Sequence, residues 1–86
     1  MKFFYTSSFK KDFHRLPKEI QVLVEQKLVL FLDNPRHPSV MAKKIEGTDY
    51  IWEGRITRNY RFTFQIENDL CVLRRVGLHD ITKRKR

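Results

Sequence analysis

Two arginines and one histidine in the C-terminal half of the chain have the types and spacing needed for phosphate chemistry. Arg55 and Arg61 lie in neighbouring segments with strand-like alternation, and His79 follows a third such segment. A guanidinium offers a rigid fork of donors to a phosphate group, and an imidazole, with an unperturbed pKa of about 6.5, exchanges protons near neutrality. We therefore take Arg55, Arg61 and His79 as candidates for binding a phosphodiester and moving a proton on it.

Two carboxylates accompany these cations. Glu53 precedes Arg55 by two residues, and Asp80 directly follows His79. A carboxylate beside an imidazole either accepts a proton itself or orients the ring. The sequence leaves open which of the two carboxylates does so. The basic residues that would extend this surface to bind RNA are Arg74, Arg58, Lys43, Lys44, Lys83 and Arg84.

The elements that must position these groups follow from the apolar pattern. Residues 2–5 are predicted to form a strand, and hydroxyl side chains at 6–8 can cap a first helix over 9–16. Pro17 suits the first turn of a second helix, which residues 33–35 end. The apolar stripe of this second helix consists of Ile20, Leu23, Val24, Leu28 and Phe31.

The rest of the chain predicts strands. Residues 51–57, 60–67 and 70–77 are rich in β-branched and aromatic types and are separated by turn signals, which predicts a three-strand meander. A further short strand is possible at 43–45. The predicted fold class is α+β, with two N-terminal helices packed on one face of a small, mainly antiparallel sheet and the other face open.

Alternation assigns side chains to the two faces of this sheet. A three-residue loop at 57–59 would place Arg55 opposite Arg61 and Glu53 opposite Thr63, all on the open face. Opposed like charges destabilise a sheet by a few tenths of a kcal/mol or more, and an anion bound between them removes that cost. The alternative is that these arginines are solvated or paired with glutamates.

In the third strand of the meander, the same alternation directs Cys71 and Leu73 into the core and leaves Val72, Arg74 and Val76 on the open face.

Composition points to one small domain with an anionic partner. The 86 residues suffice for a single core, and eighteen Lys and Arg against ten Asp and Glu give a net charge of +8. Such an excess favours nucleic acid, an acidic protein or an anionic membrane as partner. Polar residues interrupt the longest apolar stretch, 22–32, so we set the membrane aside.

The compartment and the chain end follow from simpler features. Cys71 is the only cysteine and the N-terminus carries no recognisable secretory signal, so we expect a reducing cytoplasm. Residues 81–86 are expected to form a basic tail on the single domain 1–86.

Three segments carry a family resemblance. Residues 50–56 (YIWEGRI), 59–62 (NYRF) and 73–80 (LRRVGLHD) resemble the RelE/ParE superfamily of type II toxin–antitoxin toxins. The resemblance implies a ribosome-dependent endoribonuclease that cleaves mRNA and inhibits translation, without a metal or cofactor. It also implies a cognate antitoxin wrapped around the toxin in a hetero-oligomer.

Roles follow from the resemblance by position. Arg61 resembles the phosphate-stabilising arginine of the family, Arg55 its basic partner, and His79 its acid/base residue. Two departures stand out: some relatives carry lysine where Glu53 stands, and no tyrosine follows Tyr60 near the C-terminus to stack on a base.

The sequence leaves two other functions open. One is ParE-like inhibition of DNA gyrase by protein contact, and the other is non-catalytic RNA binding.

Overall fold

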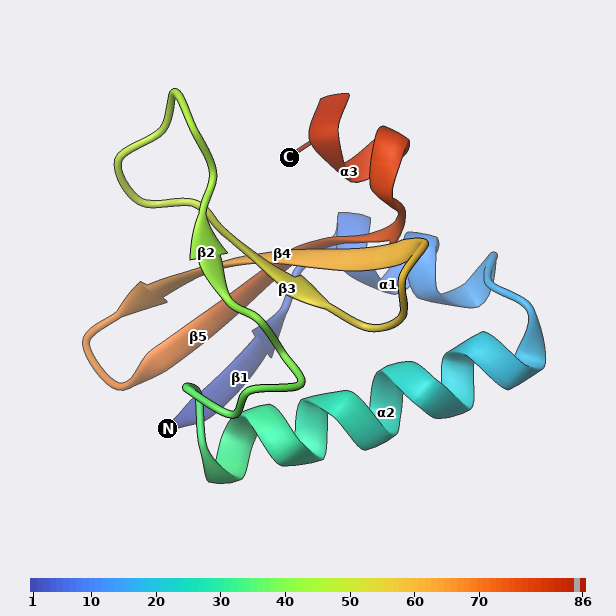
Figure 1. Cartoon of the computed structure of the whole chain (residues 1–86), viewed down its shortest axis with the longest axis horizontal. Helices are drawn as coiled ribbons and strands as arrows, with labels where there is room; N and C mark the ends of the chain where they lie inside the picture. The colour runs from blue at the N-terminus through green and yellow to red at the C-terminus, as the bar shows by residue number, and fades with distance from the viewer. Residues whose placement is uncertain (85) are drawn as a thin grey trace.

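A five-stranded sheet with helices on both faces forms the molecule (Figure 1). The structure, a computed structural model, describes residues 1–84 and 86; Lys85, near the end of the predicted tail, lies outside the described residues. The strand order is β1-β5-β4-β3-β2, in which only the β1–β5 pair is parallel. The elements are Lys2–Tyr5 (β1), Ser7–His14 (α1), Lys18–Asp33 (α2), Lys43–Lys44 (β2), Trp52–Arg55 (β3), Tyr60–Glu67 (β4), Leu70–Leu78 (β5) and His79–Arg84 (α3).

The two N-terminal helices begin where the sequence predicts. Thr6 caps α1 by accepting the N–H of Phe9 at 3.1 Å, and its hydroxyl donates to the carbonyl of Leu73 at 2.8 Å. The same hydroxyl therefore satisfies a helix end and ties α1 to β5. Pro17 stands at the N-terminus of α2, where its missing N–H costs nothing.

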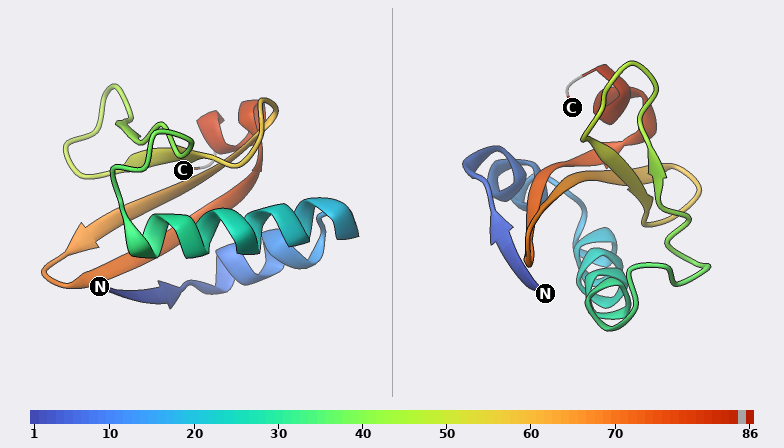
Figure 2. Two further views of the ribbon diagram at one scale, coloured as in Figure 1. Left: turned by 60° about the horizontal axis from the view of Figure 1, so that its bottom comes forward. Right: turned by 90° about the vertical axis from the view of Figure 1, so that its left-hand side faces the viewer.

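Aromatic packing holds α2 on the sheet. The ring centroid of Phe31 lies 5.5 Å from that of Phe62 and 4.8 Å from that of Phe64, both on β4. Figure 2 shows α2 running beneath the sheet. The predicted α+β class is confirmed. Leu23, predicted in the apolar stripe, is instead 38% exposed, so the buried stripe is narrower than the pattern indicated.

The register of the meander is as predicted between its first two strands. Arg55 lies opposite Arg61, and Glu53 lies opposite Thr63. The loop between β3 and β4 therefore keeps the two alternating patterns in phase, and the four side chains belong to one face of the sheet.

The prediction of which sheet face each side chain of β5 occupies is wrong beyond the middle of the strand. The register between β4 and β5 shifts between Thr63 and Phe64, where β5 contains the extra residue Arg74. A bulge of this kind reverses which face the following residues occupy. Val76, predicted on the open face, therefore lies opposite Phe62 in the core and is 2% exposed.

The outer edge of β5 beyond the bulge is covered by α1. The carboxylate of Asp12 accepts the backbone N–H of Val76 at 3.2 Å and two guanidinium N–H groups of Arg75, at 2.7 and 2.9 Å. Because β1 pairs with β5 only as far as Leu73, Asp12 replaces the missing strand at this point.

The C-terminal segment also differs from the expected tail. Residues 79–84 form α3, which lies on the face of the sheet opposite α2 (Figures 1 and 2). Thr82 on α3 is 1% exposed, and Thr63 on the sheet is fully buried. The face predicted to be open is therefore partly covered, and we call it the α3 face below.

Gly54 provides a test of the packing on the face of the sheet that α2 covers. A methyl group at position 54 would overlap the ring of Phe62, which is fully buried and cannot move aside. We expect Gly54→Ala to lower the free energy of unfolding by about 1–3 kcal/mol in urea titration. Gly77→Ala is the matched control, because a methyl group there meets nothing within 4 Å. Equal stability of the two variants would contradict this packing.

Candidate functional site

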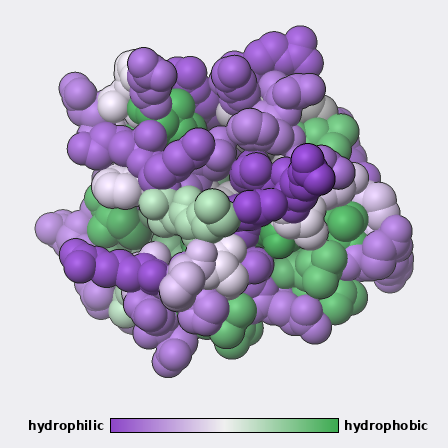
Figure 3. All heavy atoms as spheres, viewed as in Figure 1, coloured by the Kyte–Doolittle hydropathy of each residue, from purple (hydrophilic) through white to green (hydrophobic). Residues whose placement is uncertain are grey.

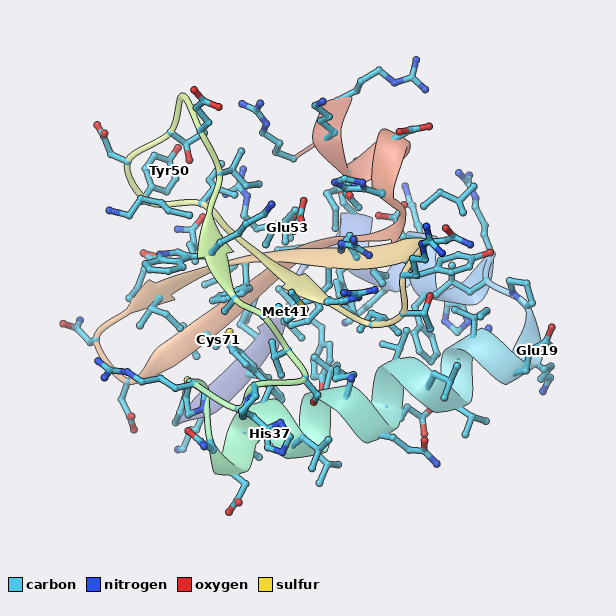
Figure 4. All side chains as sticks on the ribbon, viewed as in Figure 1. Glu19, His37, Met41, Tyr50, Glu53 and Cys71 are labelled. Carbon is cyan, nitrogen blue, oxygen red and sulfur yellow. The ribbon has the colours of Figure 1, made fainter. Side chains whose placement is uncertain are left out.

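A buried carboxylate lies between a guanidinium and an imidazole on the α3 face. The Oε1 atom of Glu53 is 3.5 Å from Nε of Arg61, and its Oε2 atom is 3.7 Å from Nε2 of His79. The glutamate comes from β3, the arginine from β4 and the histidine from the start of α3. Glu53 is only 6% exposed, so water screens these interactions weakly. Figure 4 shows Glu53 on the side of the sheet from which α3 rises.

Arg61 is held rigidly by the loop that precedes β4. Its Nη1 group donates to the carbonyls of Thr57 and Arg58, both at 2.5 Å, while its Nε points to Glu53. Among the hydrogen bonds of the described residues, none uses Nη2. Arg61 therefore presents one guanidinium nitrogen to an incoming anion from a fixed position.

His79 is anchored to the same loop. Its backbone N–H donates to the carbonyl of Asn59 at 2.8 Å, and Asn59 directly follows the loop residues that Arg61 holds. The imidazole is 43% exposed, in contrast to the buried carboxylate beside it. His79 can therefore reach a molecule bound at the surface while it remains next to Glu53.

A groove of about 480 Å³ opens beside the histidine. Its walls come from the β3–β4 loop and from the first and last turns of α3, namely Arg58, Asn59, Leu78, His79, Asp80 and Arg84. The groove carries two arginines and one aspartate, which suits a phosphate-bearing chain. Asp80 is exposed there, and no ion pair among the described residues joins it to His79.

Arg55 does not join the group, although its register was predicted correctly. Its Nη1 atom lies 3.1 Å from Sδ of Met41 in the loop before β2, and its backbone N–H donates to Val40. The two opposed guanidinium groups are therefore directed to different partners, which relieves their repulsion without a bound anion.

The other predicted RNA-binding residues are spread more widely. Arg74 donates to the side chain of Gln65 and to the carbonyl of Arg86. Lys43 and Lys44 form the exposed edge strand β2, and Lys83 is exposed on α3. Only Arg58 and Arg84 line the groove.

Two threonines of the site were not predicted as functional. Thr63 and Thr82 are fully buried where α3 meets the sheet. Alternation does place Thr63 on this face. Its burial depends on α3, whose short basic sequence gave no helix signal.

The remaining titratable groups offer little further chemistry. Burial raises the pKa of the Cys71 thiol to about 12, so this cysteine stays protonated at neutral pH. Within the described part of the chain, no three His, Cys, Asp or Glu side chains gather as metal ligands would. None of the helices there is both long and apolar enough to cross a membrane.

Comparison with solved structures identifies the fold. A YoeB/ParE toxin from Agrobacterium tumefaciens superposes with a TM-score of 0.77 at 18% identity, covering 92% of this chain and 99% of that one. YafQ from E. coli BL21(DE3) gives a TM-score of 0.78 at 13% identity, covering 93% of this chain and 94% of that one. A chain of the RelB–RelE antitoxin–toxin complex from Methanococcus jannaschii gives 0.75 at 20% identity, also covering 93% and 94%.

The chain has the fold of the RelE/ParE toxins. At the level of fold, the resemblance seen in the sequence is confirmed over nearly the whole chain. No family model matches the sequence, and no curated protein is significantly similar to it. The RelE/ParE fold leaves the roles of individual residues to be argued from the geometry above.

Replacement of Arg61 by lysine tests whether the arginine organises the loop. A lysine has a single nitrogen and cannot bond both carbonyls while also facing Glu53. We expect Arg61→Lys to lower the free energy of unfolding by about 1–3 kcal/mol and to speed hydrogen exchange at the amide of His79. The exposed Arg58→Lys serves as control and should change neither quantity. Unchanged exchange in Arg61→Lys would contradict this role.

Proposed function

We propose that this protein is the toxin of a type II toxin–antitoxin system and that it inhibits translation in the cytoplasm by cleaving mRNA on the ribosome. The observation that carries the proposal is the buried Glu53 carboxylate between Arg61 and His79, because His79 also lines a groove with two further arginines. Solved structures with the same fold are described as toxins, and several are complexes with an antitoxin.

The arrangement suits attack by the 2′-hydroxyl of RNA on the adjacent phosphate. Glu53 takes the proton of the 2′-hydroxyl as the new bond from O2′ to phosphorus forms, and protonated His79 gives its proton to the departing 5′-oxygen. The free Nη2 of Arg61 stabilises the charge that builds on the phosphoryl oxygens. The products are a 2′,3′-cyclic phosphate and a 5′-hydroxyl, so no water, metal or cofactor is consumed.

Glu53 is a better candidate for the general base than Asp80. The Glu53 carboxylate lies 3.5 Å from Nε of Arg61 and 3.7 Å from Nε2 of His79, so the three side chains can act on one phosphodiester. Asp80 is exposed in the first turn of α3, where its charge suits the helix N-terminus, and it takes no part in the proton transfers.

The RNA backbone would follow the basic side chains around the groove. Arg58 and Arg84 flank the position of the scissile phosphate, while Arg55, Arg74 and the β2 lysines lie farther along the sheet. Contacts of this kind supply affinity that falls steeply with salt and carries little base specificity.

A cognate antitoxin would bind a different surface. An apolar groove of about 440 Å³ runs between β1, α1 and α2, and its walls include Phe3, Phe13, Leu28, Val29 and Leu32, together with the polar Lys10, His14 and Glu25. Figure 3 shows apolar side chains reaching the surface around α2, whereas the region around α3 is mostly polar. An apolar segment with acidic flanks fits this groove and the net charge of +8.

Three substitutions test the catalytic assignment. We expect His79→Ala and Glu53→Gln each to slow mRNA cleavage on translating ribosomes by about 10²–10⁴-fold. Asp80→Asn, which changes a neighbouring exposed carboxylate, should leave the rate near that of the wild type. Thermal melting of each variant checks that the fold survives.

Either of two results would remove the nuclease assignment. One is cleavage and growth arrest that persist in both His79→Ala and Glu53→Gln. The other is a wild-type protein that leaves mRNA intact and stabilises gyrase–DNA cleavage complexes, which is the ParE-like activity.

Val29→Asp tests the antitoxin surface. Val29 is 67% exposed on α2 and lines the apolar groove, so a charge there should leave folding and cleavage intact. We expect the variant to escape neutralisation when it is expressed together with the product of the adjacent reading frame, with at least a tenfold loss of affinity, about 1.4 kcal/mol, in a binding titration. Val22→Asp is the control, because Val22 is 52% exposed on the same helix but does not line the groove. Full neutralisation of Val29→Asp would exclude this groove.

A further inference from the structure

Thr63 carries a polar atom that the fold leaves unsatisfied. Its side chain is fully buried, and within the described chain its Oγ1 has no hydrogen-bond partner. A buried hydroxyl without a partner costs about 1–3 kcal/mol, and valine would fill the same space without that cost. Stability alone therefore does not account for threonine at this position.

The neighbour of this hydroxyl across the sheet is the carboxylate of the site. Thr63 on β4 lies directly opposite Glu53 on β3, and side chains opposed in this way have Cβ atoms about 4.5–5.5 Å apart. Both side chains are buried on the α3 face. Arg61 and His79 lie 3.5 and 3.7 Å from the Glu53 carboxylate, so its oxygens retain the capacity to accept a short hydrogen bond.

We propose that Thr63 is a positioning residue for Glu53: its hydroxyl donates to the carboxylate and holds it aimed at the 2′-hydroxyl of the RNA. The inference rests on the proposed function for its catalytic meaning, although the hydrogen bond itself can be measured without RNA. A rotation about the Cα–Cβ bond of Thr63 turns the hydroxyl toward Glu53, because threonine side chains have more than one accessible rotamer.

This donor matters most when His79 turns to the phosphate. In the free protein Glu53 faces Arg61 on β4 and His79 on α3, with Lys43 opposite it on β2, while Arg75 of β5 lies opposite Thr63. Arg75 is neutralised by Asp12 on α1. Once RNA draws His79 toward the phosphate, Thr63 remains as the neutral donor that stays with the carboxylate.

The experiment compares two variants of Thr63 by two readouts. Thr63→Val removes the hydroxyl and keeps the shape, whereas Thr63→Ser keeps the hydroxyl. NMR of the free protein with carboxyl-labelled glutamate follows the titration of Glu53, and single-turnover cleavage on ribosomes gives the pH profile. Loss of a donor disfavours the ionised form, so in Thr63→Val both the midpoint and the acid limb of the profile should move to higher pH.

We expect a shift of about one pH unit, tenfold in the protonation equilibrium, in Thr63→Val and recovery of most of it in Thr63→Ser. An unchanged Glu53 midpoint in Thr63→Val overturns the proposal, because a purely structural threonine would alter only stability. Thr63→Ala gives the same comparison if the valine variant does not fold.

The two proposals fail in distinguishable ways. If the Glu53 midpoint shifts in Thr63→Val but the wild-type protein does not cleave RNA, the Thr63–Glu53 hydrogen bond is supported and the nuclease assignment is excluded. If cleavage depends on Glu53 and His79 but the Glu53 midpoint is unchanged in Thr63→Val, the nuclease assignment stands and the positioning role of Thr63 is excluded.

Discussion

The site depends on one buried negative charge. A carboxylate at 6% exposure is costly unless cations compensate it, and the Glu53 carboxylate has Arg61 and His79 on either side. The three groups come from β3, β4 and α3, so the compensation also joins the middle of the sheet to the C-terminal helix. Removing any one of them would leave the others in a poorer electrostatic environment, and for this reason the charges, the loop and the helix act as a unit.

Two backbone features bring these groups together. In the β3–β4 loop, the carbonyls of Thr57 and Arg58 accept hydrogen bonds from the guanidinium of Arg61. The carbonyl of Asn59 accepts the backbone N–H of His79. The bulge at Arg74 shifts β5 by one residue, so that Val76 enters the core and Gly77 lies opposite Arg61. β5 then reaches the end of the sheet where His79 can start α3 beside Glu53.

The sequence predicted those features that depend on local pattern. Period-two alternation placed Glu53 opposite Thr63 and Arg55 opposite Arg61, and hydroxyl and proline signals located the starts of α1 and α2. Alternation cannot detect a bulge, because an extra residue such as Arg74 changes parity without changing composition. The helix at 79–84 was missed for another reason: it is short and basic, and packing of Thr82 on the sheet, not an apolar stripe, holds it.

Side-chain direction was the other limit of the sequence analysis. Register predicted that Arg55 and Arg61 share a face, yet one guanidinium turns to Met41 and the other to the loop carbonyls. The sequence predicted two arginines with a phosphate between them. The structure instead has a carboxylate between an arginine and a histidine. The shared face was predictable, but the partners that each long side chain finds on it were not.

In the proposed mechanism the 2′-hydroxyl of RNA is the nucleophile, Glu53 takes its proton, and His79 gives a proton to the departing 5′-oxygen. A direct measurement uses a message with a single 2′-deoxynucleotide at the mapped cleavage position on translating ribosomes, with end analysis of the fragments. The account predicts a 2′,3′-cyclic phosphate and a 5′-hydroxyl from the all-RNA message and no cleavage at the deoxy position. Cleavage at the deoxy position at an unchanged rate would contradict it.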